Sequence, residues 1–192
     1  MPSTTTPPAS SRRAAPLPPE ERRAAIIDAV LPLLIEQGSG VTTRQIAVAA
    51  DVSEGTIFNV FSDKDELLRA ALDVAVDQGP FEAAVAQIDP SEPFELRLVQ
   101  ATELIQRRIV DIWKLVSQLG PRHDDPAEHP PLPYSHALAE LLATEQERLR
   151  IEPDDAARLL RALTLSATHP MLAAEPRCAA DIVDLFLNGA GS

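Results

Sequence analysis

Cysteine and long apolar runs are both scarce in this chain. Cys178 is the one cysteine among 192 residues, so no internal disulfide can form, and a single inert thiol fits a reducing compartment. The most apolar stretch, residues 24–35, is interrupted by Asp28 and Pro32, and no charged-apolar-small signal segment opens the chain. We therefore expect a soluble, cytoplasmic protein that does not enter a membrane.

Strand-like alternation and catalytic motifs are also missing. The absence of alternating apolar and polar residues predicts an all-α fold. The sequence contains no phosphate-binding loop, nucleophile elbow or paired-carboxylate site. A group of His and Asp residues resembles a metal cluster, but it falls in a proline-rich loop without ligand spacing on a rigid element, so solvated charge is the simpler interpretation: His123, Asp124, Asp125 and His129. We expect no enzyme activity, no metal and no cofactor.

Positive charge is scarce, and the formal net charge is −12. Residues 1–64 hold six Lys or Arg and seven Asp or Glu, a net −1, whereas residues 65–192 hold eleven and twenty-two, a net −11. The acidity therefore lies mainly in the second part, which would be held away from a nucleic acid while the nearly neutral first part approaches it. That first part is still less basic than most DNA-binding domains.

Residues 41–68 have the pattern of two short helices joined by a tight turn and followed by a third helix, which is the layout of a helix-turn-helix DNA-binding motif. Thr42 or Thr43 can cap the first helix and Ser53 the second, and Asp63 with Glu66 can form a capping box for the third. Apolar residues give the first two helices matching stripes and fill the turn between them: Ile46, Ala47, Ala50, Val52, Ile57, Val60 and Phe61.

The stretch from Arg23 to Leu72 resembles the amino-terminal domain of the TetR family of bacterial transcriptional regulators. The resemblance covers about a quarter of the chain and combines many positions in fixed order. After an amphipathic helix ending in Glu36-Gln37-Gly38 come Thr-Thr-Arg at 42–44, Ile-Ala-x-Ala-Ala at 46–50, Val-Ser-x-Gly-Thr-Ile-Phe at 52–58 and Phe-Ser-x-Lys-x-Glu-Leu-Leu at 61–68. The rest of the chain resembles the family only in its helical layout.

The resemblance implies which residues contact DNA. The start of the second helix would contact phosphates, with the arginine also reaching a base edge, residues 54–60 would form the recognition helix, and the lysine that opens the fourth helix would anchor a phosphate. The expected contact residues are Thr42, Thr43, Arg44, Glu54, Gly55, Thr56, Phe58, Asn59 and Lys64.

Three positions depart from the family pattern. Asp51 stands where glycine is usual in the turn, but aspartate tolerates a left-handed backbone. Glu54 replaces a common lysine and repels phosphates, unless it accepts from a cytosine amino group or pairs with an arginine such as Arg44. Phe58 lacks the hydroxyl of the more common tyrosine. We expect a modest, salt-sensitive DNA binder.

The remaining pattern predicts a disordered tail at 1–16, a DNA-binding domain at 17–63 and a helical regulatory and dimerisation domain at 64–192. Pro153 and Pro176 should lie in first helical turns, and Pro32 should kink the first helix or remove a backbone bond. The expected helices outside residues 41–63 are 18–37, 64–78, 81–88, 93–119, 134–150, 153–169 and 176–188, with an acidic, proline-rich loop at 120–133.

The resemblance also implies that the second domain binds a small molecule and forms a homodimer through its last two long helices. The dimer face would be Leu159, Leu160, Leu163, Ile182, Val183 and Phe186. A mainly apolar ligand with one polar group would be lined by Leu104, Ile105, Trp113, Val116, Tyr134, His136, Leu165 and His169, although aromatic residues of this kind are more often plain core.

Two functions remain open. The first is a ligand-responsive repressor that binds a near-palindromic operator on double-stranded DNA as a homodimer, with ligand entry moving the helix at 64–78. The second is a helical dimer that binds a ligand or a protein and whose DNA binding is weak or lost. Glu54 and the nearly neutral first domain motivate this alternative.

Overall fold

The computed structural model describes residues 18–119 and 134–189, and these residues contain helices and no strand. The predicted all-α fold is therefore confirmed. The helices are α1 (Pro19–Gln37), α2 (Thr43–Ala49), α3 (Glu54–Val60), α4 (Lys64–Val76), α5 (Gly79–Ala86), α6 (Phe94–Leu119), α7 (His136–Ala143), α8 (Pro153–Thr168) and α9 (Ala179–Asn188), with short 3-10 turns η1 (Gly38–Gly40) and η4 (Gln146–Arg148). No helix among these residues is long and apolar enough to cross a membrane.

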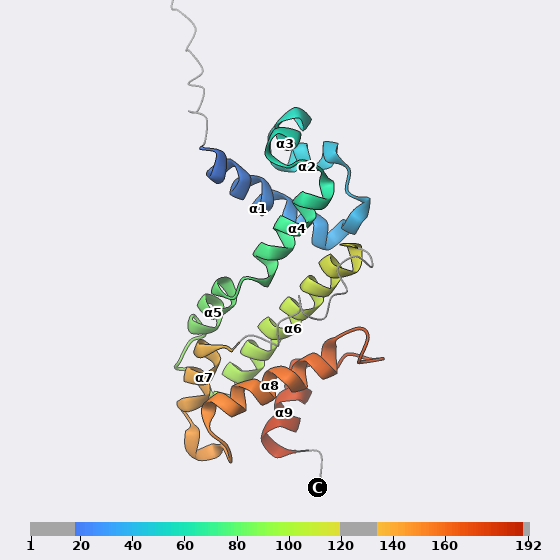
Figure 1. The fold of residues 1–192 in the computed structure, drawn as a ribbon. Helices are drawn as coiled ribbons and strands as arrows, with labels where there is room; N and C mark the ends of the chain where they lie inside the picture. Colours follow the sequence, from blue (N-terminus) through green and yellow to red (C-terminus); the bar gives the residue numbers. More distant parts are fainter. Residues whose placement is uncertain (1–17, 120–133, 190–192) are drawn as a thin grey trace, which may run out of the picture.

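The helices form two units, each with its own apolar core (Figure 1). We call α1–α4, residues 19–76, the amino-terminal unit, and α5–α9, within residues 79–189, the carboxy-terminal unit. Helix α6 belongs to both cores, because Leu98 and Ile105 are buried in the carboxy-terminal core and Leu115 is buried in the amino-terminal one. Helix α4 contributes Leu67 and Leu68 to the amino-terminal core, so that core extends past residue 63.

Local capping explains why three helices start within so short a stretch. The Thr42 hydroxyl accepts from the backbone N–H of Gln45, whose side chain accepts from the Thr42 N–H, so the two residues form a capping box. The Ser53 hydroxyl caps α3 by accepting from the backbone N–H of Thr56 at 3.2 Å, and Asp63 caps α4 by accepting from the backbone N–H of Glu66 at 2.7 Å. These three predicted caps are confirmed, but the capping box predicted for Asp63 and Glu66 is not formed, because the Glu66 side chain accepts from the backbone N–H of Ser62 instead.

Pro32 lies inside α1, and the helix continues through it. Because proline has no N–H, the carbonyl of Asp28 loses its usual helical partner. Both residues are exposed, so water can satisfy that carbonyl. The proline therefore removes a backbone hydrogen bond, as expected, on the exposed side of the helix, where water can replace it at little cost in free energy.

The helix expected at 81–88 lies two residues earlier, at Gly79–Ala86, and two other expected helices in the carboxy-terminal unit differ by three residues or more at one end. The helix predicted at 134–150 ends at Ala143, because Glu145 leaves the helical region with φ −134° and ψ 42°, and a separate 3-10 turn follows. The helix predicted at 176–188 begins at Ala179, so Pro176 is not in its first turn. Its cap is Cys178, whose Sγ accepts from the backbone N–H of Asp181 at 3.4 Å. The predicted helices at 93–119 and 153–169 are confirmed to within a residue.

Several expectations lie outside the described residues. They are the tail at 1–16 and the loop at 120–133 with His123, Asp124, Asp125 and His129. Within the described residues, no group of three or more His, Cys, Asp or Glu side chains is arranged to hold a metal ion.

Candidate nucleic-acid interface

The turn between α2 and α3 depends on an aspartate in a left-handed conformation. Asp51 has φ 52°, and no other non-glycine residue described by the structure has a positive φ. The next residue, Val52, donates its N–H to the carbonyl of Ala47 at 3.0 Å and is partly buried against the amino-terminal core. Aspartate reaches this region more readily than most residues, so the turn forms without glycine, as expected.

The expected DNA-contact residues lie on α2, α3 and the start of α4, at the far end of the molecule from the carboxy-terminal unit (Figure 1). Phe58 is a large apolar side chain, yet it is 55% exposed and is not part of the apolar core. Thr43, Thr56 and Lys64 are half-buried, and the exposed members of the set are Thr42, Arg44, Glu54, Gly55, Phe58 and Asn59.

Gly55 gives a second sign that this surface is shaped for something outside the protein. A Cβ atom added there would meet only the Ser53 Oγ, at 3.8 Å, which is ordinary van der Waals contact. Neither the space around Gly55 nor its backbone conformation therefore demands glycine. A glycine that packing does not require, on an exposed helix face, fits close approach of another backbone.

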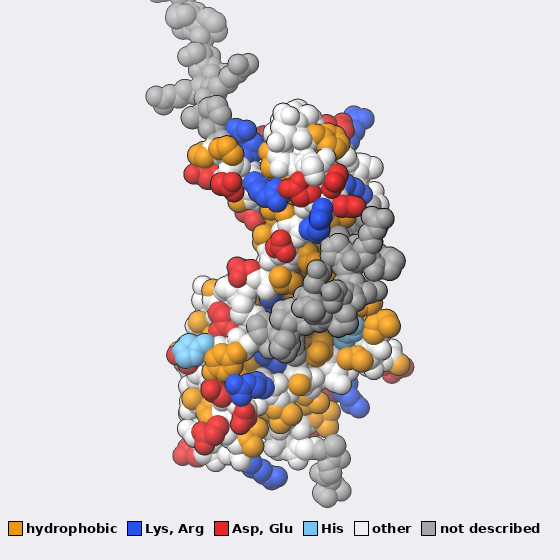
Figure 2. All heavy atoms as spheres, in the orientation of Figure 1, with side chains coloured by type: hydrophobic (Ala, Val, Ile, Leu, Met, Phe, Trp, Pro, Cys, Tyr) orange, Lys and Arg blue, Asp and Glu red, His pale blue; other side chains and the backbone are white. Residues whose placement is uncertain are grey.

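Charges of both signs mix at this end of the protein. In the view of Figure 2, Lys and Arg side chains of the amino-terminal unit lie among Asp and Glu side chains. Glu54 occupies the first position of α3, where a carboxylate favours the positive end of the helix dipole. None of the ion pairs found among the described residues joins Glu54 to Arg44, so the pairing considered for Glu54 is not formed.

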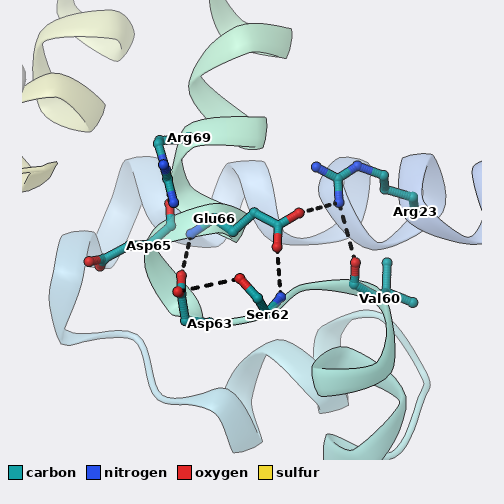
Figure 3. A network of polar contacts seen from close by, with 7 residues as sticks. All are labelled: Arg23, Val60, Ser62, Asp63, Asp65, Glu66 and Arg69. Atoms are coloured by element: carbon teal, nitrogen blue, oxygen red, sulfur yellow. Dashed lines mark hydrogen bonds and ion pairs between the residues drawn. The ribbon is translucent and has the colours of Figure 1, made fainter.

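A polar network that the sequence did not reveal connects α1, the end of α3 and the start of α4 (Figure 3). The Arg23 Nη1 lies 3.1 Å from the Glu66 Oε1 and donates to the carbonyl of Val60, the last residue of α3, at 3.4 Å. The guanidinium also stacks over the Phe61 ring, 4.4 Å from its centre, and Phe61 is fully buried. Arg23 therefore links the carboxyl end of α3 to α1.

Glu66 completes this network. Its Oε2 accepts from the backbone N–H of Ser62 at 2.7 Å. That bond, together with hydrogen bonding and charge from Arg23, lowers the pKa of Glu66. The side chain therefore remains a carboxylate at neutral pH, able to hold Ser62 and Arg23 together. The sequence pattern singled out Glu66 only as a capping residue, and Arg23 only as the first residue of the stretch resembling the TetR family.

The match to known proteins is to the same region. Residues 26–71 match the family model for bacterial regulatory proteins of the tetR family. This part of the chain is therefore similar to the amino-terminal domain of tetR-family regulators. No curated protein sequence matches the chain.

Solved structures of TetR-family regulators share the fold along most of the chain. A TetR/AcrR-family regulator from Thermobifida fusca is 23% identical with a TM-score of 0.55, covering 90% of this chain and 100% of that one. A putative TetR-family regulator from Mesorhizobium loti is 20% identical with a TM-score of 0.55, covering 90% and 98%. The TetR-like regulator LfrR from Mycobacterium smegmatis, in complex with proflavine, is 21% identical with a TM-score of 0.53, covering 89% and 98%. All three of these proteins are described as transcriptional regulators.

The residues expected to line a ligand site do not all lie together in this TetR-like fold. Trp113 and His169 meet edge to face, with ring centres 4.6 Å apart. Tyr134 and His136 are exposed and border an open surface depression instead. Trp113 and His169 do not line this depression. The Tyr134 hydroxyl donates to Asp154 at 2.8 Å. Among the other members, Ile105 is buried in the carboxy-terminal core, Leu104 and Leu165 pack partly buried against it, and Val116 is half-buried.

The expected dimer face also divides into two groups. Leu160, Ile182 and Val183 are buried in the core of the protomer, so they are not available for contact with a partner. The reason is that α8 and α9 pack on α6 as well as on each other, which uses the most apolar side of each helix. Leu159 is 51% exposed, while Leu163 and Phe186 are half-buried and border the core. The accessible part of the set therefore reduces to Leu159, Leu163 and Phe186.

Proposed function

We propose that this protein is a cytoplasmic transcriptional repressor that binds a near-palindromic operator as a homodimer and responds to a small, mainly apolar effector. The proposal depends mainly on one observation, the exposed residues of α2 and α3. Phe58 is 55% exposed, and Gly55 stands where the fold itself tolerates a side chain. An exposed aromatic beside such a glycine suits a helix that lies against a sugar-phosphate backbone in the major groove.

The polar residues of the set supply the rest of a DNA-binding surface. Arg44 is exposed at the start of α2, where its guanidinium fork can pair with phosphate or with a guanine edge. Asn59 is exposed on α3, and an asparagine amide can donate to and accept from an adenine. Because few cations lie here, phosphate binding rests on Arg44 and Lys64, and the affinity should fall with salt along a slope that reflects these few contacts.

Two copies related by a two-fold axis would place two recognition helices about one DNA turn apart, roughly 34 Å, and so bind a near-palindrome. The exposed Leu159, with Leu163 beside it on α8, supports this part of the proposal. For the effector, support comes from the fold shared with LfrR, whose structure is a complex with proflavine. The paired rings of Trp113 and His169 offer an aromatic surface of the kind that an apolar effector contacts.

A second candidate is a helical dimer that binds a ligand or a protein and has lost effective DNA binding. Glu54 favours this candidate, because it places an exposed carboxylate at the first turn of the recognition helix, where it would face phosphates.

The experiment that separates the two is binding of the full-length protein to DNA. A pool of random duplexes is selected on the wild-type protein at low salt, and the recovered sequence is tested by gel shift. We expect a near-palindromic duplex that Arg44→Ala combined with Lys64→Ala no longer retains. The matched control replaces an exposed arginine and an exposed lysine away from α2 and α3, Arg150→Ala with Lys114→Ala, and should bind as wild type does. Recovery of no duplex would overturn the proposal and favour the second candidate.

A further inference from the structure

The carboxyl end of α4 is held by an arginine from another helix. Helix α4 ends at Val76 and has no basic residue in its last turn. Arg108 of α6 donates from Nη2 to the carbonyl of Val76 and from Nη1 to the carbonyl of Asp77, the latter at 2.8 Å. The last carbonyls of a helix lack partners within the helix and carry its negative dipole end, so a guanidinium satisfies both needs at once.

Arg108 itself is anchored in the carboxy-terminal unit. It lies on α6 between Ile105 and Ile109, which are both buried in that unit's core. The guanidinium is half-buried, and burial lowers its pKa while the nearby Asp77 acts in the opposite direction. A buried cation is costly unless it is well hydrogen-bonded, so the two carbonyl acceptors make this position of Arg108 favourable.

The contact matters because the angle of α4 sets the orientation of the amino-terminal unit relative to the carboxy-terminal one. Leu67, Leu68 and Ala71 of α4 are buried in the amino-terminal core, so α1–α3 move with α4. Leu115 of α6 is buried in the same core, and α6 packs on α4, η1 and α1, so apolar packing attaches the two units to each other. Arg108 adds a polar contact at the carboxyl end of α4, seven positions and about 10 Å along α6 from Leu115. Apolar packing is not directional, whereas the two hydrogen bonds from Arg108 favour one angle of α4 against α6.

We propose that Arg108 is a positioning residue for DNA binding, which fixes the angle of α4 against α6 and so the placement of α2 and α3 relative to the carboxy-terminal unit. This inference rests on the proposed function, because the placement matters only if two recognition helices must fit one duplex. Arg108 is remote from α2 and α3, and it would nevertheless affect how well the dimer fits its operator.

The expected size follows from a population argument. Without the guanidinium, α4 samples several angles, and only a fraction of the protomers present α3 as the operator requires. The apparent Kd rises as the inverse of that fraction, and in a dimer the fraction enters twice. If roughly a third to a half of the protomers still fit, the Kd rises by about four- to ninefold.

The test uses Arg108→Gln and Arg108→Lys with Arg107→Gln as the control, because Arg107 is the exposed neighbour on α6 and its replacement changes the charge equally. Hydrogen exchange of the free proteins should be faster in Arg108→Gln over residues 70–82, while the recognition-helix peptide should exchange as in wild type. On the duplex selected by the wild type, the Kd of Arg108→Gln should rise by about four- to ninefold. Arg108→Lys keeps one charged donor and should show a smaller change, and Arg107→Gln should show none.

The salt dependence separates positioning from direct contact. The slope of log Kd against log salt should be the same in Arg108→Gln as in wild type, whereas loss of one phosphate contact in each protomer of the dimer lowers it by about two. An unchanged Kd, an unchanged exchange rate over residues 70–82, or a slope lowered by about two would each overturn the inference. If the wild type binds no duplex, the proposed function fails, and the exchange measurement still tests whether Arg108 holds α4.

Discussion

Replacing Arg23 by alanine should destabilise the amino-terminal unit by an amount that its contacts define. The cation–π contact with Phe61, 4.4 Å from the ring centre, contributes about 0.5–1 kcal/mol. The bond to the Val60 carbonyl is long, at 3.4 Å, and contributes about 0.5–1 kcal/mol. The ion pair with Glu66 adds little, because both side chains are about a third exposed. The expected loss is therefore about 1–2 kcal/mol.

The measurement is thermal unfolding of the full chain together with DNA affinity. For a protein of this length, 1 kcal/mol corresponds to about 2–4 °C, so Arg23→Ala should lower the Tm by about 2–8 °C. DNA affinity should fall as well, because the released Val60 carbonyl lets the last turn of α3 fray. Arg69→Ala is the control: Arg69 is exposed and donates to the Asp65 carbonyl within its own helix, at 3.2 Å.

The reasoning fails if Arg23→Ala and Arg69→Ala unfold at the same temperature as the wild type. It also fails if Arg23→Ala unfolds earlier but binds the selected duplex with wild-type affinity under conditions where both are folded. In that case Arg23 would stabilise α1 without positioning α3.

Two further predictions concern the surfaces of the proposed function. Glu54→Gln should bind DNA about five- to tenfold more tightly in a gel shift. A carboxylate about 6–8 Å from a phosphate costs about 0.5–0.7 kcal/mol in water, and a dimer carries two such carboxylates. Weaker binding of this variant would mean that the carboxylate accepts a hydrogen bond from a base. Leu159→Glu should shift the protein from dimer to monomer in light scattering at micromolar concentration without unfolding it, because Leu159 is 51% exposed. Ile151→Glu, at a residue 43% exposed outside α8, is its control, and an unchanged mass for Leu159→Glu would exclude α8 from the interface.

Features with a local cause were predictable from the sequence. The caps by Thr42, Ser53 and Asp63 each depend on a side chain bonding to a backbone N–H three residues away, so a short window contains the whole interaction. The left-handed Asp51 follows from its position in the turn pattern. This locality is why the boundaries of α3 agree with expectation to the residue, residues 54–60 in both cases.

Features that depend on packing were not predictable in the same manner. An apolar stripe shows that one side of a helix is buried, but not which neighbour buries it. Leu160, Ile182 and Val183 have the pattern of an interface, yet they are buried within the protomer. Similarly, the pattern does not show that the helix expected at 134–150 ends at Ala143, or that a thiol rather than a proline opens α9.

The two arginines that we single out share a physical origin. Helices α3 and α4 both end without a basic residue in their last turn, so each leaves carbonyls and a negative dipole end to be satisfied from elsewhere. Arg23 reaches the end of α3 across 37 positions in sequence, and Arg108 reaches the end of α4 across 31 and 32. A missing cation at a helix end can be read from the sequence, whereas the residue that replaces it cannot. Arg23 joins α1 to α3 within the amino-terminal unit, and Arg108 joins that unit to the carboxy-terminal one, so both arginines act on how α3 is presented.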